Sequence, residues 1–314
     1  MKHQGVEIED TFAEAFPMMA ARVIVTASSS RWAHTAVQVA TGYGTSVIAC
    51  DAEAGIERAL DPDQTPDNRP GYSFLLFGFS AKALEKALVG RIGQCVMTCP
   101  TTSCYDGLTQ SEKKVKVGAD LRYFGDRHQV SKQLMGRRYW RIPVMDGEFV
   151  CEDVFGICKG VAGGNFLILG RSQAAALEAA EAAVAAIRQE PDVICPFPGG
   201  VVRSGSKVGS VYKKLRASTN DAYCPTLRGV VESQLPDAAH AVYEVVIDGL
   251  NLDAVRRATR RGLEAACGEG IVRISAGNYG GNLGEYHISL HELMKEGNGK
   301  SDGATERRSD EGKT

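Results

Sequence analysis

The feature that most constrains the fold of this chain is an internal similarity between two pairs of segments. Residues Ala21–Cys50 and Asn165–Cys195 share one order: an apolar strand, a polar helix start, an amphipathic helix and a second strand that ends in cysteine. Serine and glutamine at each helix start offer N-cap oxygens, and Ala, Leu and Glu in the second helix favour helix formation. The repetition predicts two lobes of similar architecture.

Two further segments of the chain also share an order of elements with each other. Residues Tyr72–Gly107 and Tyr243–Gly281 each show a strand, a short polar turn, a helix of about four turns, a further strand and a glycine-containing loop. The chain therefore holds four βαβ-like units. They predict an α+β fold of two similar ferredoxin-like (split βαβ) lobes formed by internal duplication.

The 314 residues suffice for two lobes of about 150 residues each. We expect an N-terminal lobe at 1–150 with an inserted arm at 111–147, and a C-terminal lobe at 151–294. In the arm, the alternating residues Tyr139–Ile142 predict extra strands. The segment 295–314 has no large apolar residues beyond its start and is predicted to be disordered.

Charge and apolar patterning exclude several classes of protein. The net charge of −2 and the pI of about 6.3 leave no basic excess to neutralise a phosphate backbone, which argues against nucleic acid as a partner. The N-terminal residues Met1–Phe16 lack the apolar run of a signal peptide, and no stretch is long enough to span a bilayer. These features predict a cytoplasmic protein without a membrane partner, whose nine cysteines are reduced.

Three patterns typical of nucleotide or metal sites are incomplete. Gly200–Lys207 approaches a P-loop, but its lysine comes one position late and Val208 replaces the hydroxyl that would bind magnesium. His287 and His291 are predicted to lie on one strand, which lacks the helical geometry of a zinc motif. Three cysteines lack the spacing of a structural zinc site: Cys95, Cys99 and Cys104. The sequence thus predicts no metal site.

Two glycine-rich loops are candidate ligand contacts. Cys195–Gly209 contains two prolines and four glycines, so it is either a long turn or a loop whose backbone approaches a ligand closely. Its candidate substrate-binding residues are Gly199, Gly200, Ser204, Gly205, Ser206 and Lys207. Ser275–Gly284 surrounds Asn278 and Tyr279 with four glycines, and is either a β-turn with a left-handed asparagine or a ligand surface.

Glu244 is the strongest single candidate for a functional residue. It lies within Ala241–Ile247, a strand too apolar to face water on both sides. Its carboxyl group is therefore either at an edge of the sheet or partly buried with a raised pKa. The second alternative would make Glu244 a proton carrier near neutral pH.

The chain contains long, unusual strings at Gly5–Pro17, Ala40–Arg58, Arg69–Tyr72, Arg91–Thr102, Gly160–Phe166, Cys195–Lys207, Ala241–Leu250 and Ile274–Leu293. Together, from about Gly5 to Leu293, they closely resemble formylmethanofuran:tetrahydromethanopterin formyltransferases. The resemblance implies a homotetramer of two-lobed subunits. It also implies methanofuran and tetrahydromethanopterin, or its dephospho form, as coenzyme substrates, with no permanently bound cofactor.

The resemblance also assigns roles. It makes Glu244 the general acid/base and places substrate contacts in the loop at Pro196–Lys207, and at Asn278 and Tyr279. The near-neutral charge and the polar tail are similar to the version in methylotrophic bacteria, which sits in a formyltransferase/hydrolase complex. That version transfers the formyl group towards formylmethanofuran.

The implied reaction is direct transfer in a ternary complex. The acceptor amine attacks the formyl carbon, glycine-loop amides stabilise the oxyanion, and Glu244 protonates the departing nitrogen. Two alternatives stay open at this point. One is a non-catalytic structural subunit of a formyl hydrolase complex, and the other is a hydrolase in which water replaces the acceptor amine.

Overall fold

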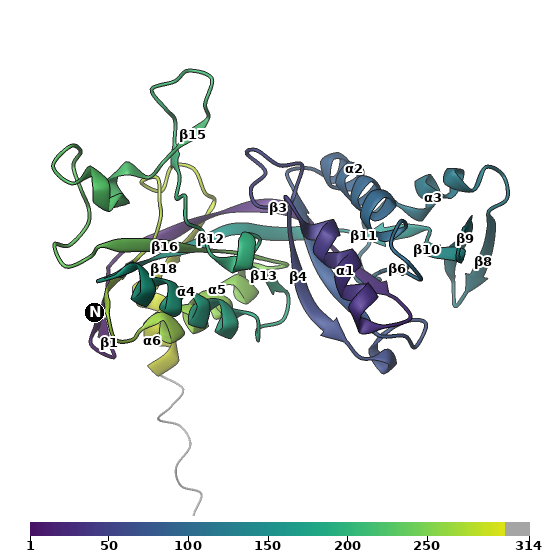
Figure 1. Ribbon diagram of the computed structural model, residues 1–314, viewed down its shortest axis with the longest axis horizontal. Helices are drawn as coiled ribbons and strands as arrows, with labels where there is room; N and C mark the ends of the chain where they lie inside the picture. Colours follow the sequence, from purple (N-terminus) through teal and green to yellow (C-terminus); the bar gives the residue numbers. More distant parts are fainter. Residues whose placement is uncertain (299–314) are drawn as a thin grey trace, which may run out of the picture.

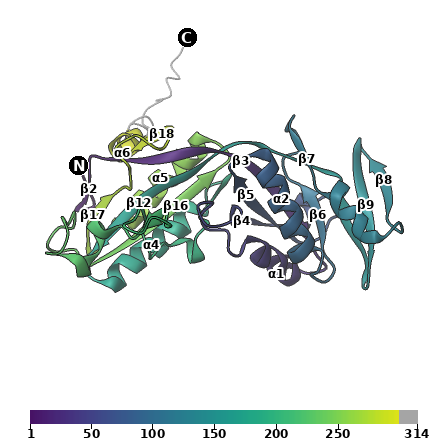
Figure 2. The same ribbon diagram turned by 90° about the horizontal axis from the view of Figure 1, so that it is seen from above.

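A computed structural model of the chain describes residues 1–298 and shows an α+β fold built on one large mixed sheet (Figure 1). Its two longest strands are β3 (Phe12–Thr26) and β12 (Cys158–Gly170), which pair antiparallel from Ala20 with Cys158 to Phe16 with Ala162. Figure 2 shows the two halves side by side, with β3 passing from one to the other. The halves are therefore joined by continuous sheet.

The first half places two helices on a four-stranded antiparallel unit. Its elements after β3 are α1 (Ser30–Thr41), β4 (Glu53–Leu60), β5 (Gly71–Gly78), α2 (Ala81–Arg91) with a π-helical extension at Ile92–Val96, and β6 (Ser103–Asp106). The strands lie in the order β4-β5-β3-β6. Ser29 and Ser80 cap α1 and α2 by accepting backbone N–H bonds, which explains where both helices begin.

The second half repeats this order. Its elements after β12 are α4 (Gln173–Ile187), β13 (Val193–Ile194), β16 (Ala241–Gly249), α5 (Leu252–Ala266) and β17 (Ile271–Ser275). The strands lie antiparallel in the order β13-β16-β12-β17. Ser172 and Asn251 cap the two helices, as the serines do in the first half.

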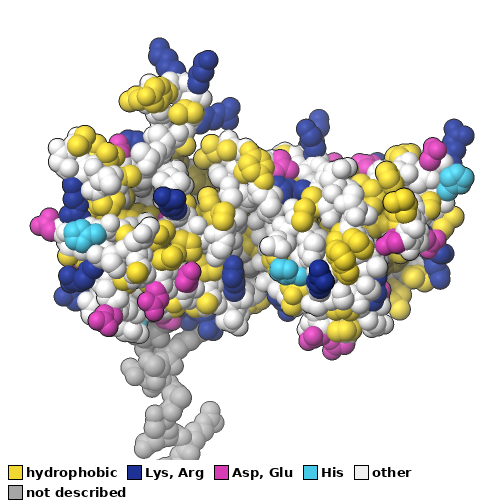
Figure 3. Space-filling model, viewed as in Figure 1, with side chains coloured by type: hydrophobic (Ala, Val, Ile, Leu, Met, Phe, Trp, Pro, Cys, Tyr) yellow, Lys and Arg dark blue, Asp and Glu magenta, His cyan; other side chains and the backbone are white. Residues whose placement is uncertain are grey.

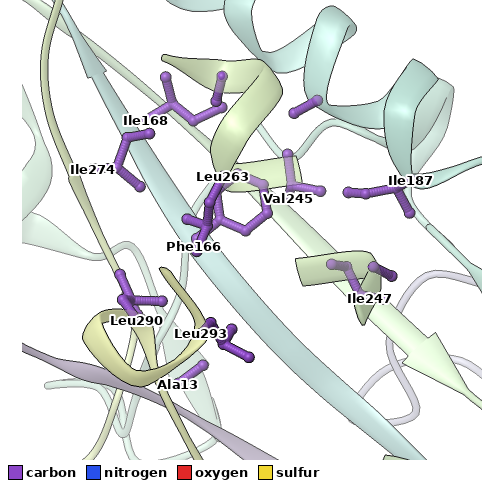
Figure 4. Packing of buried hydrophobic residues seen from close by; sticks show 14 of the residues in the cluster. Ala13, Phe166, Ile168, Ile187, Val245, Ile247, Leu263, Ile274, Leu290 and Leu293 are labelled. Atoms are coloured by element: carbon purple, nitrogen blue, oxygen red, sulfur yellow. The ribbon is translucent and has the colours of Figure 1, made fainter. Parts of the chain in front are cut away.

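The core of the second half lies between the sheet and its helices. Phe166 of β12 packs beside Leu263 of α5 and Val245 of β16, and all three are fully buried (Figure 4). Because successive residues of a strand point to opposite faces, Glu244 lies on the face of β16 away from this core. That face, which α4 and α5 leave uncovered, carries the cavity described below.

One predicted strand is displaced. The apolar residues before Cys50 form turns, and the strand after α1 begins at Glu53. A close contact shapes this connection, because a side chain at Gly44 would approach the Cβ of Ala54 to 2.7 Å. Val47 packs against the cluster between the two halves, which accounts for the apolar character of the turn.

The arm predicted at 111–147 contains strands and a short helical segment. It contains β7 (Lys114–Lys116), α3 (Gly118–Leu121), β8 (Val130–Leu134) and β9 (Arg137–Val144). Then follow β10 (Gly147–Glu152) and β11 (Val154–Gly156). Strands β10, β9 and β8 extend the large sheet beyond β6, so the strand expected at Tyr139–Ile142 is present within β9.

The chain ends lie in the second half. Strands β1 (Lys2–His3), β2 (Val6–Ile8) and β18 (Tyr286–Ser289) pair with neighbouring strands there, and Val6 and Ile8 join its core. The predicted N-terminal lobe therefore contributes its first residues to the other half. Helix α6 (Leu290–Asn298) runs into the segment predicted to be disordered, because Leu293 and Met294 anchor it in the core. The rest of that predicted tail, 299–314, lies outside the described residues.

The remaining elements are short. A hairpin joins β14 (Lys207–Val208) to β15 (Ala217–Ser218) and projects from the second half (Figure 1). Single 3-10 turns lie at Pro62–Gln64, Arg122–Gly125, Pro198–Gly200, Asp221–Tyr223 and Pro225–Leu227. Of the helices within residues 1–298, none combines the length and the apolar character needed to cross a membrane.

Candidate active site

A cavity of about 270 Å³ lies on the face of the second half that α4 and α5 leave uncovered. Its wall combines β16 and β12, the loop after β17, and the start of the β14–β15 hairpin. Six of the lining residues carry the chemistry: Asn165, Ser206, Lys207, Glu244, Asn278 and Tyr279. Both glycine-rich loops therefore meet at Glu244, although 71 residues separate Lys207 from Asn278 (278 − 207).

Glu244 is held by backbone pairing on both sides. Its strand neighbour in β12 is Leu167, and on the other side it exchanges backbone hydrogen bonds of 2.7 and 3.0 Å with Val202. The side chain lines the cavity, and burial raises the pKa of Glu244 to about 7. Of the two placements left open by the sequence, the structure has the partly buried one.

Tyr279 lies close to Glu244 in the cavity. Burial raises the pKa of the Tyr279 phenol, and the Glu244 carboxyl group raises it further, whereas a hydrogen bond with the Ser206 hydroxyl lowers it. Tyr279 therefore stays protonated at neutral pH and can donate a hydrogen bond. This contact joins the two glycine-rich loops through their side chains.

Asn278 has a structural contact as well as a place in the cavity wall. Its side-chain amide donates to Thr11 Oγ1 (3.0 Å) and to the Phe12 carbonyl (3.2 Å). The left-handed asparagine considered from the sequence is absent from the described loop, where Gly280 and Gly281 take the positive φ angles of 72° and 75° instead. These two glycines turn the chain so that Asn278 can reach back to β3.

The first loop contributes its side chains to the cavity, and its glycines lie elsewhere. Gly199 and Gly200 form a turn against α4, where a side chain at Gly200 would meet Val184 Cγ1 at 2.6 Å. Ser204 and Gly205 also lie outside the cavity lining, and Gly205 packs near Asn220. Close packing explains the glycine at Gly200, and the ligand contacts expected of Gly199 and Gly200 stay a prediction.

Lys207 is tied to the base of its hairpin. Its ammonium group forms an ion pair with Asp221, at 2.5 Å between Nζ and Oδ2, and this contact lowers the pKa of Asp221. The hairpin tip beyond it is basic and apolar. Its exposed residues are Val211, Tyr212, Lys213, Lys214 and Leu215, and Figure 3 shows the basic side chains projecting there.

Several residues of the site were not singled out by the reasoning from sequence, and Asn165 and Glu14 are two that hold its second loop in place. Asn165 Oδ1 accepts the Gly277 N–H (2.7 Å), and its amide donates to the Gly277 carbonyl (3.3 Å). Glu14 accepts backbone N–H bonds from Tyr279 and the residues that follow it. Each is a polar residue in an otherwise apolar strand, which is the same signal that singled out Glu244.

A larger groove lies in the first half, but it lacks acid–base groups suited to proton transfer. Its volume is about 690 Å³, and its lining includes Met97, Phe124 and Met145. The one carboxylate in that lining belongs to Asp146, which accepts the Thr101 N–H at 2.8 Å. The smaller cavity at Glu244 is therefore the candidate active site.

The histidine pair is arranged differently from the prediction. Strand β18 ends at Ser289, so His287 lies on a strand and His291 in helix α6. His291 contacts the N-terminal amine and the Ile8 carbonyl. Within residues 1–298, no three His, Cys, Asp or Glu side chains are grouped so that they could hold a metal ion.

Comparison with known proteins identifies the family. A family profile described as formylmethanofuran-tetrahydromethanopterin formyltransferase matches residues 1–144, and one described as FTR, proximal lobe, matches residues 147–293. A Methylococcus capsulatus protein named formylmethanofuran–tetrahydromethanopterin formyltransferase is 58% identical over 294 residues, covering 92% of this chain and 98% of the relative. A Methylorubrum extorquens protein, named as a subunit of the formyltransferase/hydrolase complex, is 51% identical, covering 93% of this chain and 96% of the relative.

Solved structures agree with these matches. The formylmethanofuran:tetrahydromethanopterin formyltransferase of Methanosarcina barkeri superposes with a TM-score of 0.90 at 49% identity, covering 94% of this chain and 100% of the other. A chain of the formyltransferase/hydrolase complex of Methylorubrum extorquens, solved with methylofuran, gives a TM-score of 0.91 at 50% identity, covering 94% and 98%. This chain belongs to the formylmethanofuran–tetrahydromethanopterin formyltransferase family.

Proposed function

We propose that this chain is a formyltransferase that moves a formyl group between formylmethanofuran and N5 of tetrahydromethanopterin. Family membership over nearly the whole chain supports the activity and the two coenzymes as substrates. The observation that carries the chemistry is the Glu244 carboxyl group, partly buried in a cavity with a pKa of about 7. A carboxyl group with that pKa can both accept and donate a proton near neutral pH.

In the proposed mechanism, both coenzymes bind before any bond breaks. The acceptor amine attacks the formyl carbon, which gives a tetrahedral intermediate with a negatively charged oxygen. Glu244 donates its proton to the departing nitrogen, whose bond to carbon then breaks as the carbonyl re-forms, and the proton released by the acceptor nitrogen passes to the Glu244 carboxylate and restores its protonated form. The departing group leaves as a neutral amine, which a protonated carboxyl group makes possible.

We propose that the donors to the oxyanion are side chains, in place of the glycine-loop amides expected from the sequence. The backbone N–H groups of Gly277 and Tyr279 already donate to Asn165 and Glu14. Side-chain donors in the cavity wall that could meet the oxyanion include the hydroxyl of Ser206, the ammonium of Lys207 and the phenol of Tyr279. A donor aimed at developing charge in such a site is worth about 3–4 kcal/mol.

The decisive test is formyl transfer by the purified chain alone. We expect a spectral change of the pterin when the chain is mixed with formylmethanofuran and tetrahydromethanopterin. Formate release in the absence of tetrahydromethanopterin would instead favour a hydrolase. The structural-subunit alternative is not favoured, because relatives that span the chain are named as the formyltransferase itself. Inactivity of the purified chain in this mixture would revive it.

The proposal extends to the architecture of the two halves. We assign a ferredoxin-like (split βαβ) lobe formed by duplication to each half, with boundaries at 1–150 and 151–294. The common strand order, β4-β5-β3-β6 and β13-β16-β12-β17, supports the duplication. The family profiles, which divide at 144 and 147, support the boundary.

The assembly completes the proposal. We expect a cytoplasmic homotetramer that also binds hydrolase subunits and works towards formylmethanofuran in a methylotrophic metabolism. The Methylorubrum extorquens relative, whose name places it in a formyltransferase/hydrolase complex, supports the hydrolase partners. The exposed edge strand β8 offers unpaired backbone groups to a second copy. Light scattering of the purified chain will give the oligomeric state, and a tagged chain expressed in its own cells will show which subunits copurify.

A further inference from the structure

Glu14 is a buried carboxylate surrounded by backbone donors. It lies in β3 and is 1% exposed. One carboxylate oxygen accepts the N–H groups of Tyr279 (2.7 Å) and Gly281 (2.6 Å). The other accepts those of Leu283 (3.0 Å) and Gly284 (2.7 Å). Burial opposes ionisation, but these four donors together lower the pKa of Glu14, so the group is an anion at neutral pH.

The loop at 279–284 is shaped around this anion. Gly280 and Gly281 adopt positive φ angles, which lets successive N–H groups converge on one point. A side chain at Gly284 would meet the Glu14 Cβ at 2.7 Å, so glycine is required for the close approach. Such a concave arrangement of N–H groups normally binds an external anion, and here the chain supplies its own.

The same loop forms one wall of the cavity. Asn165 holds it at Gly277, and Asn278 holds it to the start of β3 at the Phe12 carbonyl. Tyr279 lies directly after these two anchors, and its own N–H is one of the bonds to Glu14. The position of the Tyr279 side chain beside Glu244 therefore depends on the bonds made by Glu14.

We infer that Glu14 is a positioning residue for formyl transfer, which holds Tyr279 in the cavity by serving as the permanent anion of the 279–284 loop. The inference rests on the proposed function. Glu14 acts through the loop, since its two oxygens are occupied by the four backbone N–H groups. Its neutral replacement should therefore change the geometry at Glu244 without removing any group that touches the coenzymes.

The test compares Glu14→Gln and Glu14→Asp with a matched control. Glutamine offers one acceptor oxygen and an NH₂ group, so two of the four N–H donors lose their partner. Aspartate keeps the charge but is shorter. The control is Glu152→Gln, because Glu152 is also buried and accepts a backbone N–H, from Asp106 at 2.9 Å, in the first half.

We expect Glu14→Gln to stay folded and to lower kcat by about 10- to 100-fold, the scale for a small misplacement of catalytic groups. A looser loop also admits water to Glu244, so the pH midpoint of kcat/KM should move below that of the wild type. Glu14→Asp should recover part of both effects. Glu152→Gln should lower only the thermal stability. A folded Glu14→Gln variant with wild-type kcat, KM and pH midpoint would reduce Glu14 to a structural residue.

If Glu14→Gln does not fold, a second variant tests the same inference. Gly281→Ala strains the loop at its φ of 75° and leaves the buried carboxylate in place. It should lower kcat and shift the pH midpoint in the same direction, and an unchanged kcat and midpoint would overturn the inference. Hydrogen exchange of the amides at 279–284 gives a readout independent of activity. If the wild type does not transfer formyl groups, the proposed function fails. Faster hydrogen exchange of the 279–284 amides in the variants would still show that Glu14 holds the loop.

Discussion

The carboxyl groups of Glu53 of β4 and Asp248 of β16 lie close together where the two halves of the molecule meet, and one oxygen of each, Glu53 Oε2 and Asp248 Oδ2, is buried without a hydrogen-bond partner among the described residues. Asp248 is fully buried, and its other carboxyl oxygen accepts the Gly163 N–H at 2.9 Å. Burial raises the pKa of Glu53, and it raises that of Asp248 well above its ordinary value, aided by the charge of Glu53. Two carboxyl groups this close cannot both ionise at little cost, so the pair retains a proton.

This pair predicts a stability that falls with rising pH. The native state keeps protons that the unfolded chain releases near pH ~4, so the free energy of unfolding decreases from there until the native pair also ionises. Each pH unit over which one extra proton is held costs about 1.4 kcal/mol. Asp248→Asn should lose less stability than the wild type between about pH 5 and pH 9, measured by urea unfolding.

The control for that series is Asp237→Asn, because the Asp237 side chain is fully exposed. It should follow the wild-type pH dependence. Parallel curves for Asp248→Asn and the wild type would mean that the buried pair does not couple folding to pH.

Removal of the proposed proton donor is the second prediction. Glu244→Gln should keep the fold and lower turnover by about 100-fold or more, because an amide of the same shape cannot transfer the proton. The measurement is kcat for formyl transfer, together with a thermal melt. Glu269→Gln removes an exposed carboxylate of the same half and should leave kcat unchanged. Near-normal turnover in Glu244→Gln would take Glu244 out of the chemistry.

The third prediction concerns the pH dependence of the reaction. The protonated form of Glu244 is the active one for expelling the amine, and its pKa is about 7. The value of kcat/KM should therefore decline as the pH rises through about 7, and the residual activity of Glu244→Gln should lack that step. A wild-type profile that is flat from about pH 6 to pH 9 would contradict the role of Glu244 as the acid.

The fourth prediction separates the side chains of the first loop from its glycines. Lys207→Ala removes a cation from the cavity wall and should lower kcat/KM by about 10-fold or more. Gly199→Ala affects a turn outside the cavity, where the added methyl group has open space but the φ of 65° strains alanine, so it should lower stability and leave kcat/KM within about twofold. If Gly199→Ala lowered kcat/KM strongly while Lys207→Ala kept the wild-type kcat/KM, the ligand contact would have to come from the glycine backbone.

Much of this architecture follows from local sequence. Serine or asparagine precedes each of the four main helices, and its side chain caps the helix where the sequence predicts a start. Because side chains alternate between the two faces of β16, Glu244 points away from the core, while the residues before and after it point into the core. Turns such as the one before Glu53 are harder to predict, since Val47 is apolar for a contact made with the other half.

The sequence by itself determined the α+β elements, the repeated unit and the one carboxyl group to which we assign a chemical role, because these depend on periodicity and on neighbours along the chain. Tertiary structure decided what surrounds that group. Glu14 and Tyr279 are 265 residues apart yet bonded, and Gly200 proved to be a packing position against Val184. Such contacts form only when strands far apart in the sequence pair, and no local sequence pattern indicates which hydrogen-bond donor will meet which acceptor.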